Sequence, residues 1–171
     1  MLKAQDIVVL LKLVSQGSDW TFGQIAKDLG LSASAVHRSL ERAERSGLYD
    51  SNRKLVNRAA FLEFLLHGAR YVFPAVRQGE ARGIPTAWAA PPLREQLLSA
   101  QQNAPVWPFA KGKVRGIALE PLHPVVPGSA ERDPLLGELL ALVDAIRIGN
   151  ARERGLAGKE LERRLEAPVL A

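Results

Sequence analysis

The stretch that decides the fold runs from Thr21 to Leu48 and reads TFGQIAKDLGLSASAVHRSLERAERSGL. Thr21 followed by Gln24 fits a capping box, in which the Thr hydroxyl accepts from the backbone N–H three residues on. Apolar residues then recur at helical spacing as far as Gly30, and glycine favours the left-handed conformation at a helix end. The stretch therefore predicts a short helix that ends in a tight turn.

A second helix is predicted directly after this turn. Ser32 is a candidate N-cap, the apolar residues Val36, Leu40 and Ala43 share one face, and Gly47 ends the run. Small polar residues lie at the start of this helix, and several cations follow them. Small residues allow close approach to a groove of DNA, and cations can contact phosphates.

The pattern I-A-K-D-L-G-L-S-x-S-x-V-H-R-x-L, from Ile25 to Leu40, resembles the winged helix-turn-helix of bacterial transcriptional regulators, especially the MarR and IclR types. The resemblance covers residues 1–58, with residues 2–15 as the helix packed behind the motif. In such regulators the second helix of the motif lies in the major groove. The resemblance implies a DNA-binding set in which Arg42 faces the DNA backbone; its other members are Thr21, Ser32, Ser34, Ala35, His37 and Arg38.

A small hairpin is predicted over residues 48–57, where two short apolar runs flank a polar turn. In a winged helix this hairpin is the wing, so the resemblance implies that Arg53 and Lys54 also contact DNA. The predicted hairpin is shorter than the wing of MarR-type regulators, and a purely structural turn is the alternative. Asn57 is then expected to cap a helix that runs to about His67.

Composition and charge limit the function classes. The chain has 171 residues, a net charge of +5 and no cysteine, so disulfides, thiolate metal sites and cysteine nucleophiles are excluded. The positive excess lies in residues 1–128, as a nucleic-acid binder needs. The sequence shows neither a metal-ligand spacing nor a phosphate-loop or nucleophile motif. We therefore expect no enzyme activity, no cofactor and no metal, and a soluble cytoplasmic protein without a membrane span.

The middle of the chain contains an internal repeat. Ten of the eleven prolines lie between Pro74 and Pro134, which argues against a mainly helical region. The first copy consists of Val72-Phe73-Pro74, Gly79 and Arg82-Gly83. The same pattern recurs as Val106-Trp107-Pro108, Gly112 and Arg115-Gly116. Each copy predicts a β-hairpin, with a short helix between the copies at 92–102. The aromatic residues either fill a core or, with the arginines, contact a partner or an anionic ligand; the candidates are Arg82, Trp88, Trp107 and Arg115.

The C-terminal region returns to helix. An apolar helix is predicted from Pro134 to Ile148, and a charged helix from Ala151 to Leu165 follows a break at Gly149. The first helix has a broad apolar face, which suits either packing on the helix at 58–67 or a dimer seam. The residues assigned to such a seam are Leu135, Leu139, Leu142 and Ile146.

Together these patterns predict an α+β protein with three segments. They are a winged helix-turn-helix at 1–67, a region of two repeated hairpins at 68–133 and a helical dimerisation or docking region at 134–171. The resemblance implies sequence-specific binding of double-stranded DNA by a homodimeric transcriptional regulator, most simply a repressor. One version is an antitoxin-like autorepressor that also binds a protein partner. The alternative is a protein-interaction module that uses the winged helix only as a scaffold.

Overall fold

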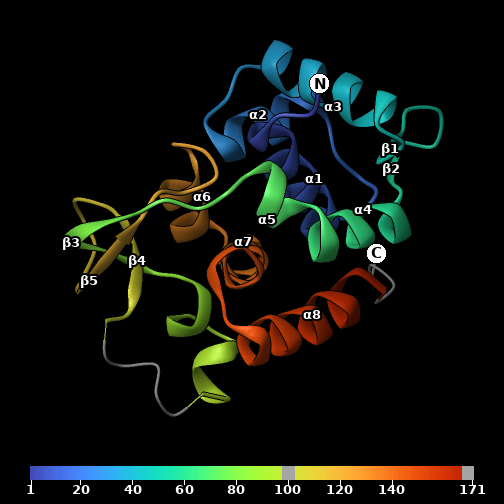
Figure 1. The fold of residues 1–171 in the computed structure, drawn as a ribbon. Helices are drawn as coiled ribbons and strands as arrows, with labels where there is room; N and C mark the ends of the chain where they lie inside the picture. The colour runs from blue at the N-terminus through green and yellow to red at the C-terminus, as the bar shows by residue number, and fades with distance from the viewer. Residues whose placement is uncertain (98–102, 167–171) are drawn as a thin grey trace.

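The computed structural model describes residues 1–97 and 103–166, and these form an α+β fold (Figure 1). Its helices are α1 (Ala4–Gln16), α2 (Phe22–Leu29), α3 (Ala33–Arg45), α4 (Arg58–His67), α5 (Ala69–Val72), α6 (Val126–Arg132), α7 (Pro134–Ile148) and α8 (Ala151–Glu166). Its strands are β1 (Tyr49–Asp50), β2 (Leu55–Val56), β3 (Arg77–Pro85), β4 (Pro105–Pro108) and β5 (Val114–Leu119). The mixed α+β class predicted from the sequence is confirmed.

The core is built around two helices that are apolar on nearly all sides. Residues 7–11 of α1 are fully buried, and residues 139–147 of α7 are at most 9% exposed. Such all-round burial is typical of a helix inside a domain rather than on its surface. Figure 1 shows α7 nearly end-on at the centre, with α8 below it and α1 above it. One hydrophobic cluster therefore joins the N-terminal, middle and C-terminal segments.

The local signals in the N-terminal segment act as predicted. The side chains of Thr21, Ser32 and Asn57 accept hydrogen bonds from the backbone N–H three residues on and begin α2, α3 and α4. Gly30 ends α2 in the left-handed conformation, with φ 71°. Strands β1 and β2 form the predicted antiparallel hairpin, in which Tyr49 is paired with Val56.

The two repeated hairpins are not formed, and a closed three-stranded barrel takes their place. Strand β3 is one continuous strand that includes Gly79, where the first hairpin turn was predicted. Both β4 and β5 pair antiparallel with β3, but they run parallel to each other and so are not the arms of a hairpin. Because β3 has nine residues, its last three, Gly83–Pro85, pair with β4, while the part from Arg77 to Gly83 pairs with β5. The helix predicted at 92–102 is reduced to a 3₁₀ turn at Leu93–Glu95, and residues 98–102 lie outside the described part.

The repeat has a physical meaning that the prediction missed. The glycine of each Arg-Gly pair lies where two backbones touch. A Cβ at Gly83 would overlap the carbonyl oxygen of Trp107, and a Cβ at Gly116 would overlap that of Ala104. Gly112 likewise lies directly against the backbone of Gly83. A barrel of three strands closes only with such short approaches, and glycine is the residue that permits them.

A buried ion pair attaches the barrel to the helical body. Asp144 and Arg147 on α7 are 1% and 9% exposed, and their side chains are 2.8 Å apart. The Asp144 carboxylate also accepts hydrogen bonds from Thr86 Oγ1 and Trp107 Nε1, both at 2.7 Å. Burial raises the pKa of Asp144, while Arg147 and these two donors act against that effect.

Arg147 extends the same connection to the other copy of the repeat. Its Nε donates to the carbonyl of Phe73 at 2.8 Å, and its Nη2 donates to that of Pro74 at 3.4 Å. The Phe-Pro and Trp-Pro units of the repeat therefore contact one ion pair from two directions. Trp107 is 1% exposed and belongs to the core, which matches the structural alternative for this residue rather than the ligand-binding one.

The apolar face of α7 is covered by the chain itself. Leu139, Leu142 and Ile146, which were assigned to a dimer seam, are at most 4% exposed because α1, α4, α5 and α8 pack around them. Only Leu135 of that set remains exposed, at 63%. The structure thus brings these three residues into the core, but the expected partner helix at 58–67 (α4) covers α7 less than α1, α5, α6 and α8 do. The break at Gly149 and the charged helix α8 are formed as predicted.

We expect Gly83→Ala to disrupt the barrel and Gly79→Ala, in the same strand, to be tolerated. The added methyl at position 83 meets the backbone of Trp107, with 2.6 Å to its carbonyl carbon, whereas position 79 has open space. Overpacking against a fixed backbone costs about 1–3 kcal/mol or more. Chemical denaturation of both variants measures the difference, and equal stabilities would contradict the barrel closure.

We expect Arg147→Met to lower the free energy of unfolding by about 3–5 kcal/mol, because it leaves the Asp144 carboxylate buried without its cation. The double variant Asp144→Leu, Arg147→Met removes both charges and is expected to lose less than the sum of the two single variants. A double-mutant cycle from denaturation curves gives this coupling. Strict additivity would show that the two side chains act separately.

Candidate nucleic-acid interface

Helix α3 has one buried face and one exposed face. Val36, Leu40 and Ala43 are at most 3% exposed and pack toward α1 and α2. The opposite face follows the spacing i, i+4, i+7, i+11 and is polar and exposed; it consists of Ser34, Arg38, Glu41 and Arg45, flanked by His37. Arg45 was not in the predicted set, although its helical spacing from Arg38 places it there. The structure thus presents a continuous polar stripe along α3.

The hydroxyl groups at the start of the stripe have structural partners. Ser32 Oγ accepts from the N–H of Ala35 at 3.1 Å and lies 3.2 Å from Ser34 Oγ. Thr21 Oγ1 accepts from Gln24 N at 3.1 Å, so both cap residues in the predicted set hold helix ends in place. Ala35 is half-buried, and its carbonyl accepts from Gln5 on α1 at 3.4 Å. Ser34 is exposed and stands at the N-terminal end of the polar face.

His37 lies against an aromatic support. Its ring centroid is 5.4 Å from that of Phe22, and Phe22 makes an edge contact with Trp20 at 5.5 Å. His37 Nδ1 lies 3.7 Å from Glu41 Oε1, and the His37 side chain is 59% exposed. This arrangement fixes one side of the ring and leaves the other side open at the surface.

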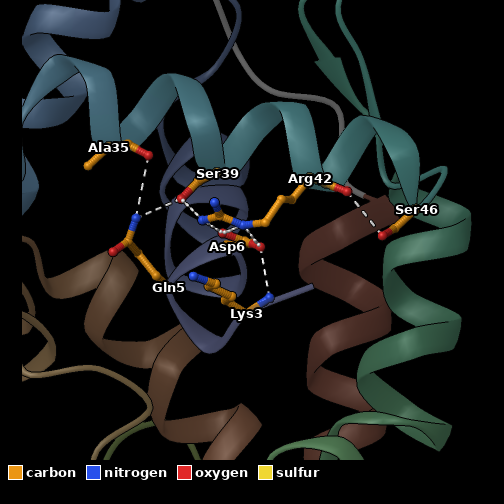
Figure 2. Close-up of polar contacts among 7 residues, drawn as sticks. All are labelled: Lys3, Gln5, Asp6, Ala35, Ser39, Arg42 and Ser46. Carbon is orange, nitrogen blue, oxygen red and sulfur yellow. Dashed lines mark hydrogen bonds and ion pairs between the residues drawn. The ribbon is translucent and has the colours of Figure 1, made fainter. Parts of the chain in front are cut away.

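Arg42 lies differently from its predicted place at the DNA backbone. Its side chain turns inward onto the fully buried Asp6 of α1, with Nη2 2.6 Å from Oδ1 and Nε 2.9 Å from Oδ2 (Figure 2). Arg42 Nη2 also donates to Ser39 Oγ, and Gln5 donates to that same hydroxyl at 2.8 Å. The hydrogen bonds with Asp6 raise the pKa of Arg42. The side chain therefore clamps α3 to α1 and is directed away from the polar stripe.

Asp6 has a second task at the start of α1. Its Oδ2 accepts from the backbone N–H of Lys3 at 2.8 Å, which closes the capping box of that helix (Figure 2). A single buried carboxylate thus holds both the N-terminus of α1 and the orientation of α3. Sequence reasoning missed this residue, because a lone Asp in an apolar run gives no sign of its distant partner.

The β1–β2 hairpin is fixed to the end of α3. Glu44 Oε1 accepts from the backbone N–H of Ser51 at 3.4 Å and also from its hydroxyl. Asp50 accepts from the N–H of Arg53 at 3.1 Å and lies 3.8 Å from its guanidinium. Lys54 completes the turn with φ 54° and is exposed, as is Arg53. Both predicted wing cations are therefore at the surface.

The stripe and the hairpin carry little net charge. The two contribute four cations, Arg38, Arg45, Arg53 and Lys54, and two carboxylates, Glu41 and Asp50, while Glu44 at the end of α3 adds a third carboxylate between them. Within the described residues no carboxylate pairs with Arg38 or Arg45. A groove of about 370 Å³ separates α3 from the hairpin, and the two glutamates line it together with Lys54. The surface is suited to hydrogen bonding more than to long-range attraction of a polyanion.

The candidate ligand-binding residues of the middle region do not form one site: the two arginines lie together, but the two tryptophans lie elsewhere. Arg82 and Arg115 lie directly opposite each other on β3 and β5, and both are exposed. Trp88 is half-buried beside Arg77, whose guanidinium carbon is 5.8 Å from the ring centroid. Those two side chains line a cavity of about 250 Å³ with Ile117 and Leu119. Trp107 is buried in the core, with an exposed fraction of 1%.

The described residues contain neither a candidate metal-binding cluster nor a membrane-spanning helix. No group of three or more histidines and carboxylates gathers there as a metal site. No helix of that part is long and apolar enough to cross a membrane. Comparison of the chain with family models, curated proteins and solved structures found no match.

We expect Asp6→Ala and Arg42→Ala each to lower the free energy of unfolding by about 3 kcal/mol. This is the lower end of the range for breaking a buried ion pair, because Arg42 is partly exposed. The double variant is expected to lose little more than either single variant. Denaturation curves give these values, and hydrogen exchange of α3 locates the loss. The matched control is Arg38→Ala, at an exposed position of the same helix, which should stay within about 0.5 kcal/mol of the wild type.

Proposed function

We propose that the protein binds duplex DNA through α3, as the recognition helix of a winged helix-turn-helix formed by residues 1–67. The observation that carries this proposal is the polar stripe of α3, held outward by a scaffold that uses the other face of the same helix. The order of α2, a tight turn, α3 and an antiparallel hairpin supports it. The resemblance of residues 25–40 to bacterial regulators points to the same function.

In this proposal the stripe enters the major groove. Ser34 at the N-terminal end is small enough for close approach, while Arg38 and Arg45 contact guanine edges or phosphates. His37 and Glu41 offer further hydrogen-bonding groups to base edges. The hairpin places Arg53 and Lys54 next to the backbone of the same duplex. Arg42 is omitted, because its guanidinium is bound to Asp6.

The regulatory role is proposed on the same basis. A homodimer presents two copies of α3 to half-sites about one helical turn apart, and occupancy of the operator represses transcription. Autorepression by an antitoxin-like protein is one form of this mechanism. Because Leu139, Leu142 and Ile146 are buried within the chain, the proposed dimer uses a different surface.

A protein-interaction module is the second candidate function. The near balance of cations and carboxylates on the stripe and hairpin favours it, since DNA-binding surfaces usually carry a clear positive excess. In that case α3 serves as a docking surface for another protein and has no affinity for duplexes.

We expect the wild type to bind duplex DNA and the double variant Arg38→Ala, Arg45→Ala to bind at least roughly tenfold more weakly. Loss of two phosphate or base contacts should also reduce the slope of log K against log salt by up to about two. Fluorescence anisotropy at several salt concentrations measures both. The matched control is Arg152→Ala, Lys159→Ala on α8, with the same charge change at exposed positions. Absence of duplex binding by the wild type at low salt would leave the protein-interaction candidate.

A further inference from the structure

A cluster of positive charge lies away from α3, on the barrel. Four exposed cations gather there, and we call this surface the barrel tip; they are Arg82, Lys111, Lys113 and Arg115. Glu80 is the one acidic residue with an ion-pair distance to any of them in the described part of the chain, 3.6 Å from Arg115. Both side chains of that pair are 71% exposed, so the pair adds little stability, although Glu80 offsets one of the four positive charges. The tip therefore holds a net charge of about three, more than half of the +5 of the whole chain.

Barrel closure brings Arg82 of β3 next to the contiguous stretch 111–115, which carries the other three cations. Gly112 lies on the backbone of Gly83, so its neighbours Lys111 and Lys113 flank the residue that follows Arg82. The N–H of Phe109 donates to the carbonyl of Arg82 at 3.1 Å, which fixes the β4–β5 loop at the same place. The backbone geometry alone thus sets the position of the lysines.

Strand register adds the fourth cation at a cost in stability. Arg82 and Arg115 are directly opposed on antiparallel strands, and like charges in that position repel each other. The fold holds this pair at the surface without a carboxylate between them that would cancel both charges. A bound polyanion would remove this repulsion, because its phosphates neutralise both guanidinium groups.

From this geometry we infer that the barrel tip is a second DNA-contacting surface, which binds the phosphate backbone and provides most of the salt-dependent affinity. The inference rests on the proposed function, DNA binding. The stripe and hairpin, counted with Glu44, have an excess of only one positive charge. The tip would supply the electrostatic attraction for phosphates that this surface lacks. In this arrangement α3 selects the sequence, whereas the tip attracts any duplex.

The test neutralises the tip in the full chain by Arg82→Gln, Lys111→Gln, Lys113→Gln and Arg115→Gln. Binding to duplexes of about three helical turns, of random and of selected sequence, is measured by anisotropy between roughly 50 and 200 mM salt. We expect the salt slope to fall by about three to four and the affinity to fall at least roughly tenfold, equally for both sequences. All four positions are exposed, so the variant should fold, and loss of the Arg82–Arg115 repulsion should leave its melting temperature at or slightly above that of the wild type.

The matched control carries the same charge change at exposed positions outside the barrel, in the Leu93–Glu95 turn and α8: Arg94, Arg152, Lys159 and Arg163. It should alter the slope by less than about one. A tip variant that binds duplexes like this control overturns the inference, while a weakened Arg38→Ala, Arg45→Ala variant would still support α3 as the contact. A weakened tip variant beside an unaffected α3 variant supports the inference and refutes the role of α3. Binding of poly-glutamate without binding of duplex would assign the tip to an acidic protein and overturn the inference.

Discussion

The buried ion pair between Asp144 and Arg147 determines how the two parts of this molecule fit together. A barrel of three short strands has too small an interior to be stable alone. It is held by Trp107 and Thr86, which both donate to Asp144, and by the Phe73 carbonyl, which accepts from Arg147. Because each of these groups is satisfied only when the barrel lies on α7, the buried charges specify one orientation. A purely apolar contact would leave that orientation less defined.

The same principle operates at the other end of the core. Lys12 of α1 is 5% exposed and pairs with Asp28 at 3.3 Å and with Asp133 at 2.8 Å. Asp133 also caps α7, accepting from Leu136 N at 3.1 Å. Every buried side-chain nitrogen and oxygen in the described part of the chain has a hydrogen-bond partner. The helices are therefore placed by polar contacts that are specific in direction, while the apolar cluster supplies the bulk of the driving force.

The sequence predicts those features that depend on neighbours along the chain. Caps such as Thr21 and Ser32, the stop at Gly30 and the α7–α8 break all follow from local chemistry, and all are observed. The barrel was not predictable in this way, since Gly79 and Gly83 look alike in sequence and differ only in what lies opposite them. Arg42 was misplaced for the same reason, because its partner Asp6 is 36 residues away. Long-range pairing of charges and of backbones has no local signal.

The arrangement of charge offers a physical account of how the proposed binding of DNA is compatible with a candidate recognition surface that is nearly neutral. Carboxylates beside a recognition helix weaken non-specific attraction, so hydrogen bonds to base edges contribute a larger share of the binding there. Glu44 illustrates the constraint, since it fixes the hairpin through Ser51 and would still oppose phosphates nearby. Because Glu44 is needed to hold the hairpin in position, the cations that attract DNA phosphates must lie elsewhere on the protein. We propose the barrel tip for that role, because backbone closure brings its cations together at the surface without depending on their charge.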